Sequence, residues 1–262
     1  MKYFDSHAHY YDARFGEEYA GGVDELIDAL LSSTVSGIIN VGTSVANCRL
    51  AIAQASARKE MYTALGIHPY DATHIETSLD NSLSEIEKMI KDPRSKAVAL
   101  GEIGLDYHYP DTDEPLQKKY FEAQMQLAQE LDIPVVIHDR DSHADVLEVI
   151  KKYRNVRGIL HSFSGSVEMA REVASLGYMI SFSGTLTFKN ARRPREVAAA
   201  VPREQVLIET DCPYLAPHPL RGTLNHSGNL EYTNSVLAEI WAVTPEISAQ
   251  ITEENARRFF SI

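Results

Sequence analysis

Cysteine is scarce in this sequence of 262 residues, which has only Cys48 and Cys212 and no C-x-x-C pair. Two cysteines are too few for a disulfide framework and suit a reducing compartment. Long hydrophobic runs are also missing, since no stretch approaches the ~20 apolar residues that span a bilayer. The start lacks the charged and apolar regions of a secretory signal. These absences predict a cytoplasmic protein without a membrane partner.

Basic residues are the minority among the charged ones. The sequence has 25 Lys and Arg against 37 Asp and Glu, a formal net charge of −12. A strongly negative molecule repels polyanions, which argues against a protein that reads DNA sequence. An enzyme acting on phosphodiesters remains compatible with this charge, because bound metal ions and a local basic patch can dominate the field at a site.

Short apolar runs alternate with longer amphipathic segments along the whole chain. The hydrophobic fraction of 44% and the charged fraction of 24% are those of a globular protein. Near-continuous apolar strands indicate a parallel sheet that is buried on both faces. Eight such strands in this length predict one domain over residues 1–262, a (β/α)8 TIM barrel. The predicted strands cover residues 3–7, 37–42, 61–68, 97–104, 133–139, 157–163, 178–184 and 205–211.

Helical spacing is clearest over residues 114–132, where Leu116, Tyr120, Met125, Leu127 and Leu131 form one apolar stripe. After the eighth strand, a loop rich in proline and glycine leads to two additional C-terminal helices. The last of them is predicted to begin with Thr244 as its N-cap and Pro245 at its first position. We expect both helices to complete the outer ring.

The opening "DSHAHY" contains two histidines, His7 and His9, whose H-x-H spacing alone decides nothing. Other candidate metal ligands end four further predicted strands, and these ends meet at one face of a barrel, where the active sites of such enzymes lie. One histidine at a strand end is more often structural than functional. Five agreeing strands make that interpretation improbable for the set. The candidate ligands are His7, His9, Glu102, His138, His161 and Asp211.

Four imidazoles and two carboxylates suit borderline divalent ions, and a carboxylate can bridge two of them. Six ligands with one bridge predict two ions, Zn²⁺, Mn²⁺ or Mg²⁺, about 3.5–4 Å apart. Such a centre activates water for hydrolysis, with Asp211 as a candidate general base. The ligand set therefore predicts a metal-dependent hydrolase.

The chain resembles the TatD family of metal-dependent deoxyribonucleases, among the amidohydrolase-like barrels. The resemblance runs from Phe4 to the closing "ENARRFF" and rests on "DSHAHY", "GIHPY", "GEIGLDY", "IHDRDSHAD", "HSFSGS" and "ETDCPYLAP". It implies that His7, His9 and Asp211 bind one metal, and that His138 and His161 bind the second. Glu102 would be shared between the two metals. The implied activity is 3′–5′ exonucleolytic cleavage of single-stranded DNA, with RNA as a further candidate.

Substrate contacts are less fixed by the sequence. By residue type, His68 is about equally a loop histidine or a phosphate contact, and the resemblance implies the latter. Lys189 begins a basic run that usually forms a solvated face but here follows the seventh strand, and Arg221 is a second candidate phosphate contact. Tyr107 could stack on a base, although an aromatic residue after a strand more often packs.

The loop after the eighth strand departs from the family pattern. Family members commonly carry R-G-K-x-N-E-P there, whereas this chain has "RGTLNHSGN", with Thr223 for the lysine and His226 for the glutamate. The loop would border the site, so this departure bears on substrate preference and not on the metal ligands.

Two other functions stay open. A metal-activated water can also attack a carbonyl, so the alternative is an amidohydrolase or esterase, for example on an aminoacyl ester of tRNA. A third hypothesis is a non-catalytic metal-binding protein, which is disfavoured because all six candidate ligands are present. We expect a monomer that needs no protein partner and takes single-stranded DNA or RNA ends as substrate.

Overall fold

The computed structural model describes residues 1–19, 21–74 and 78–262. Eight parallel strands form one sheet in sequence order, from β1 to β8. This order confirms the predicted barrel of alternating strands and helices. The strands are β1 Tyr3–Ala8, β2 Val35–Gly42, β3 Met61–Leu65, β4 Ala97–Asp106, β5 Val135–Arg140, β6 Gly158–Leu160, β7 Met179–Phe182 and β8 Val206–Ile208.

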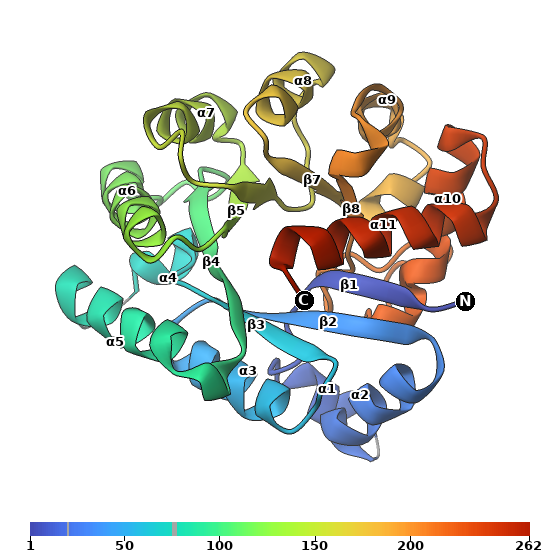
Figure 1. Cartoon of the computed structure of the whole chain (residues 1–262), viewed down its shortest axis with the longest axis horizontal. Coiled ribbons are helices and arrows are strands. Elements are labelled where there is room, and N and C mark those ends of the chain that lie inside the picture. Colours follow the sequence, from blue (N-terminus) through green and yellow to red (C-terminus); the bar gives the residue numbers. More distant parts are fainter. Residues whose placement is uncertain (20, 75–77) are drawn as a thin grey trace.

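Helices surround this sheet (Figure 1). The α-helices are α1 Arg14–Glu18, α2 Gly22–Ser33, α3 Val45–Ser56, α4 Pro69–Ala72, α5 Leu79–Lys91, α6 Glu114–Leu131, α7 His143–Lys152, α8 Val167–Ser175, α9 Arg192–Ala200, α10 Leu230–Trp241 and α11 Pro245–Phe260. Short 3-10 helices are η1 Pro93–Ser95, η2 Gly184–Thr187, η3 Arg203–Gln205 and η4 Ser227–Asn229. Among the described residues, no helix combines the length and the apolar character that a membrane crossing requires.

Helix α6 forms as the sequence predicts. The Asp113 side chain accepts a hydrogen bond from the backbone N–H of Leu116, which satisfies one free donor of the first turn. The predicted stripe faces inward, with Tyr120, Met125 and Leu127 buried. Asp132 ends the helix in the left-handed conformation.

The barrel closes where the ends of β1 and β8 meet. The buried Asp5 carboxylate accepts hydrogen bonds from the backbone N–H of Thr210 at 3.0 Å and from its hydroxyl at 2.6 Å. The backbone N–H of His9 donates to the carbonyl of Cys212 at 2.8 Å, and the N–H of Asp211 donates to the carbonyl of His7 at 2.9 Å. These hydrogen bonds join the first strand, β1, to the segment that follows the last strand, β8.

The last helix differs from the prediction. Helix α10 packs against α9 and η2 in the outer ring, as expected. Helix α11 instead lies across the barrel, against β1 and β8, with the C-terminus close to β1 (Figure 1). Its Ala256, Phe259 and Phe260 join the apolar cluster inside the barrel, which includes Phe4 and Leu207. The expectation that both C-terminal helices complete the outer ring is therefore wrong for α11, which plugs the amino-terminal end.

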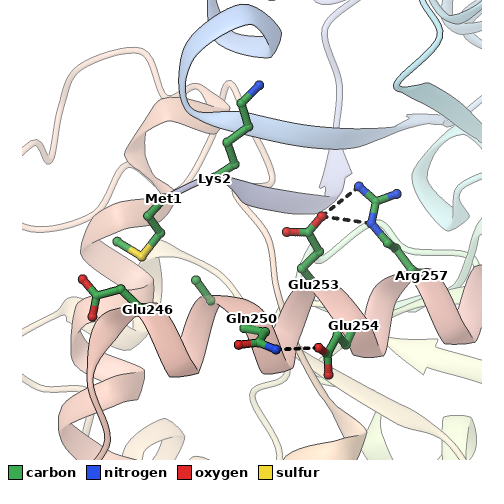
Figure 2. A pocket seen from close by; sticks show the side chains of 8 residues that line it. Met1, Lys2, Glu246, Gln250, Glu253, Glu254 and Arg257 are labelled. Atoms are coloured by element: carbon green, nitrogen blue, oxygen red, sulfur yellow. Dashed lines mark hydrogen bonds and ion pairs between the residues drawn. The ribbon is translucent and has the colours of Figure 1, made fainter.

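A surface pocket of about 460 Å³ lies at this plugged end, between the start of the chain and α11. Figure 2 shows Met1 and Lys2 above the helix. On the helix, Arg257 donates a hydrogen bond to Glu253, and Gln250 donates one to Glu254. The pocket is lined by the chain start and α11, whereas the predicted metal ligands belong to the carboxyl ends of the strands. It is therefore separate from the predicted site.

Candidate metal centre

The six predicted ligands come from five strands whose carboxyl ends face one another. His7 lies in β1 and His9 directly follows that strand. Glu102 lies in β4 and His138 in β5. His161 directly follows β6, and Asp211 comes three residues after the end of β8.

The first group of side chains gathers around one oxygen of Glu102. The Oε2 atom of Glu102 lies 3.3 Å from Nε2 of His7 and 3.6 Å from Nε2 of His9. The Oδ1 atom of Asp211 lies 3.3 Å from Nε2 of His9 and 3.8 Å from Nε2 of His7. The two imidazole nitrogens are 3.1 Å apart. Four donor atoms from three strand ends thus converge on one small space.

The second group gathers around the other oxygen of the same carboxylate. The Oε1 atom of Glu102 lies 2.8 Å from Nδ1 of His138 and 2.8 Å from Nε2 of His161. Those two nitrogens are 3.1 Å apart. Glu102 is 3% exposed, so its two oxygens serve these groups and not the solvent.

These spacings fit metal ions. Four ligands about 2.1 Å from a tetrahedral ion lie about 3.4 Å from one another. The donor–donor distances in the first group run from 3.1 Å to 3.8 Å. Among the described residues, three sets of side chains have ligand atoms within 4.8 Å of one another: His7, His9 and Asp211; His7, Glu102 and His161; and His68, Glu102 and His138. The residues present therefore fit a metal in the first group and, through Glu102, a second one beside it.

The second ring nitrogens of His9, His138 and His161 have partners that orient the rings, whereas the buried Nδ1 of His7 has no hydrogen-bond partner among the described residues. Nδ1 of His9 lies 2.7 Å from the carbonyl oxygen of Val41. Nε2 of His138 lies 3.2 Å from Oδ2 of Asp106, and Nδ1 of His161 lies 3.3 Å from Oε1 of Glu209. A proton held at each of these contacts leaves the opposite nitrogen as a lone pair that faces the cluster.

Asp106 and Glu209 were given no role by the sequence analysis, although both stand in the quoted segments "GEIGLDY" and "ETDCPYLAP". They are 3% and 1% exposed. Each is an acidic residue at the end of an otherwise apolar strand, close in sequence to a candidate ligand. This placement could have indicated their role, because a carboxylate at the end of a buried strand needs a hydrogen-bond partner.

Electrostatics keep the two carboxylates ionised. Burial alone would raise the pKa of Glu102, but the neighbouring His161, His68 and His7 bring that pKa well below its usual range. Burial also opposes ionisation of Asp211, and His9 outweighs it, so the pKa of Asp211 is lowered. The pKa of His7 is lowered, first by burial and then by His161. Burial opposes protonation of His9, His138 and His161, but the neighbouring carboxylates outweigh it and raise the pKa of these three imidazoles, so a bound metal ion would displace their protons.

His68 differs from the six ligands. Strand β3 ends at Leu65, earlier than predicted, and His68 caps the short helix α4. Its Nδ1 accepts a hydrogen bond from the backbone N–H of Tyr70 at 3.0 Å. Burial lowers the pKa of His68 to about 3, so the ring is neutral with its proton on Nε2. That nitrogen lies 3.5 Å from Oε1 of Glu102 and is a donor directed at the cluster.

The two predicted basic contacts lie on loops that meet. Lys189 is exposed just after η2, and its neighbour Phe188 lies under Arg221. The guanidinium carbon of Arg221 is 4.5 Å from the centre of the Phe188 ring. The loops after β7 and β8 are thereby joined. Contact of Lys189 and Arg221 with a substrate stays a prediction.

Three further side chains near the candidate site have structural roles. The Tyr107 hydroxyl donates a hydrogen bond to Asp145 at 2.8 Å and its ring packs against the core, so this tyrosine has a packing role. Burial raises the pKa of the Cys212 thiol well above its usual value, which makes the thiol an inert buried group. Asp5 is a buried structural carboxylate at the β1–β8 junction.

Known proteins resemble the chain over almost its full length. The family model for TatD related DNase matches residues 4–261. The uncharacterized metal-dependent hydrolase YabD of Bacillus subtilis is 38% identical over 261 residues, which is 99% of this chain and 99% of that protein. The uncharacterized metal-dependent hydrolase YcfH of Escherichia coli is 33% identical, over 98% of this chain and 95% of that protein.

Solved structures agree with this similarity. The crystal structure of YjjV, a TatD homologue from Escherichia coli, superposes with a TM-score of 0.87 at 28% identity. The superposition covers 99% of this chain and 98% of YjjV. The match spans all five strands that carry the clustered histidines and carboxylates. The chain therefore belongs to the TatD-related DNase family of metal-dependent hydrolases.

Proposed function

We propose that this protein is a two-metal phosphodiesterase that removes nucleotides from the 3′ end of single-stranded DNA, with RNA as a second substrate. The observation that carries the proposal is the position of Glu102, whose two oxygens lie 2.8 Å from Nδ1 of His138 and 3.3 Å from Nε2 of His7. A carboxylate shared in this way suits two adjacent ions, a common arrangement in enzymes that cleave phosphodiesters.

Six side chains would hold the ions, which we take to be Zn²⁺, Mn²⁺ or Mg²⁺. His7, His9 and Asp211 would hold one, and His138 and His161 the other, with Glu102 on both. When bound, such ions lower the pKa of water from 15.7 towards about 7 and offset negative charge on a phosphate.

The protein's own groups would then handle protons and charge. Asp211, ionised and beside His9, is placed to accept the proton of the attacking water. The N–H of His68 can donate a hydrogen bond to a phosphate oxygen, and this bond would strengthen as that oxygen gains negative charge. Lys189 and Arg221, on the joined loops after β7 and β8, would neutralise the phosphates of the strand.

Product analysis tests this function. Protein loaded with Mg²⁺, Mn²⁺ or Zn²⁺ should shorten a single-stranded oligonucleotide from its 3′ end and release 5′-mononucleotides, and a chelator should stop it. Glu102→Gln should lower kcat by at least about 100-fold, because one neutral amide replaces the shared anion. Glu130→Gln, an exposed change on α6, is the matched control and should leave kcat unchanged.

The competing chemistry has a different outcome. If metal-loaded protein leaves DNA and RNA intact but hydrolyses an ester or amide, including an aminoacyl ester of tRNA, the phosphodiesterase assignment is wrong.

A further inference from the structure

Three tyrosines are conspicuous among the exposed side chains of the described residues. Tyr70, Tyr109 and Tyr214 are 49%, 47% and 48% exposed. They follow β3, β4 and β8, at the end of the barrel that carries the metal ligands. Exposed aromatic surface of this kind commonly marks a binding region, because it is costly to leave in water.

Two of these tyrosines belong to a row of four exposed rings, which we call the aromatic wall: Tyr70, His74, His108 and Tyr109. The ring of His74 stacks on Tyr70 with centres 4.5 Å apart and an interplanar angle of 25°. Tyr70 meets Tyr109 edge to face at 5.9 Å, and Tyr109 meets His108 at 5.4 Å. The loops after β3 and β4 thus present one continuous aromatic surface.

The aromatic wall is continuous with the candidate metal centre. His68 packs edge to face on His138 with ring centres 4.5 Å apart, and its Nδ1 accepts the backbone N–H of Tyr70. The donor His68, beside the second group of ligands, is therefore only two residues from Tyr70 of the aromatic wall. The Arg140 guanidinium carbon lies 5.6 Å from the Tyr109 ring centre and supplies a cation at the far end.

We propose that the aromatic wall is the base-binding surface of the enzyme and stacks an unpaired base next to the phosphate held at the metal centre. This inference rests on the proposed function for its substrate class, a single-stranded nucleic acid. Aromatic rings suit that substrate because every base has a π-face, so stacking holds a strand without reading its sequence. Duplex ends, whose bases are already stacked, would bind this surface poorly.

The test is the double variant Tyr70→Leu/Tyr109→Leu on metal-loaded, full-length protein. It should raise KM for a single-stranded oligonucleotide by about tenfold or more and leave kcat nearly unchanged. Tyr70→Trp/Tyr109→Trp should restore KM, since tryptophan keeps the stacking face. Tyr232→Leu, on α10 of the outer ring, is the matched control and should leave KM unchanged.

An abasic oligonucleotide separates stacking from other causes. With abasic sugars in the last three positions, wild type and the leucine variant should have equal KM. An equal loss on both oligonucleotides, or no loss on the normal one, overturns the proposal.

Binding without turnover distinguishes this inference from the proposed function. Fluorescence anisotropy of a labelled oligo-dT strand with chelator present should show weaker binding by the leucine variant than by wild type. Tyrosine-dependent binding without cleavage by the wild type would contradict the nuclease function and keep the aromatic wall. Cleavage with no effect of the tyrosines would keep the nuclease function and reject the aromatic wall.

Discussion

At the scale of single residues, the roles of His9, His138 and His161 depend on the partner of the second ring nitrogen. His138 is unusual, since it directs Nδ1 at Glu102 and Nε2 at Asp106, whereas His161 directs Nε2 at Glu102. The Asp106 carboxylate keeps the proton on Nε2 of His138, and that choice leaves Nδ1 free to bind.

Asp106→Asn should therefore weaken metal binding at the His138 and His161 position by about 10–100-fold. The amide keeps the size of the side chain but removes the anion that fixes the ring. Isothermal titration of the metal-free protein measures this loss. Asp141→Asn is the control, because it alters an exposed carboxylate–histidine pair with His108. Equal affinities in Asp106→Asn and Asp141→Asn would rule out the assigned role.

Sequence reasoning named the six candidate ligands that the structure clusters, and it missed the carboxylates that hydrogen-bond to the histidines, for a physical reason. Strand ends of a barrel meet by geometry, so His7 and Asp211 could be placed together from strand order alone. The partner of Nε2 in His138 depends on a rotamer and on a contact between β4 and β5, neither of which leaves a pattern in the sequence. For His68, the sequence could suggest a contact with the substrate phosphate. It could not predict that His68 caps α4, because that role depends on β3 ending at Leu65.

At the scale of elements, α11 determines how the amino-terminal end of the barrel is sealed. Both a ring helix and a plug have an apolar stripe, so periodicity could predict the helix, with its Thr244 cap and Pro245, but not its position. Phe259 and Phe260 are 7% and 5% exposed inside the barrel cluster.

Phe259→Ala should lower the free energy of unfolding by about 3–5 kcal/mol, because it opens a cavity among packed side chains. Urea unfolding measures the change. Ile247→Ala, on the same helix but 46% exposed, should stay within about 0.5 kcal/mol of wild type. Similar losses in the two variants would contradict the role of the plug, because helix propensity favours alanine at both positions and cannot cause a loss.

The loop of residues 221–229 contains a titratable cap. Nδ1 of His226 accepts the backbone N–H of Gly228 at 3.1 Å and caps η4, a contact that only an unprotonated nitrogen can make. Burial lowers the pKa of His226 below its ordinary value of 6.5. The folded protein thus binds this proton less readily than the unfolded chain. The stability due to His226 is complete above that value and is lost as the pH falls below it.

Urea unfolding with chelator at about pH 7.5 and about pH 5.5 tests the cap. Wild type should lose more stability on acidification than His226→Asn, which keeps a capping side chain without a charge change. All other titratable groups are the same in the two proteins, so the difference between the two losses isolates His226. Equal losses would mean that this cap does not titrate in the window.

At the scale of the whole molecule, the barrel brings residues about 200 positions apart into one cluster in an acidic chain. The order β1 to β8 and the alternation with helices followed from apolar runs and their spacing. The exposure of Tyr70, Tyr109 and Tyr214 could not be predicted in this way, because the exposure of a loop side chain depends on how neighbouring loops pack. Because the net charge is −12, binding of the proposed polyanionic substrate would depend on local features such as the clustered candidate ligands.

The central claim is that six side chains hold two metal ions on either side of Glu102. Anomalous scattering from crystals grown with Mn²⁺ or Zn²⁺ tests it directly. Wild type should show two peaks about 3.5–4 Å apart, one between His7, His9 and Asp211 and one between His138 and His161. In His9→Ala the first peak should weaken and the second should persist. A single peak in wild type, or equal loss of both peaks in His9→Ala, would contradict the account.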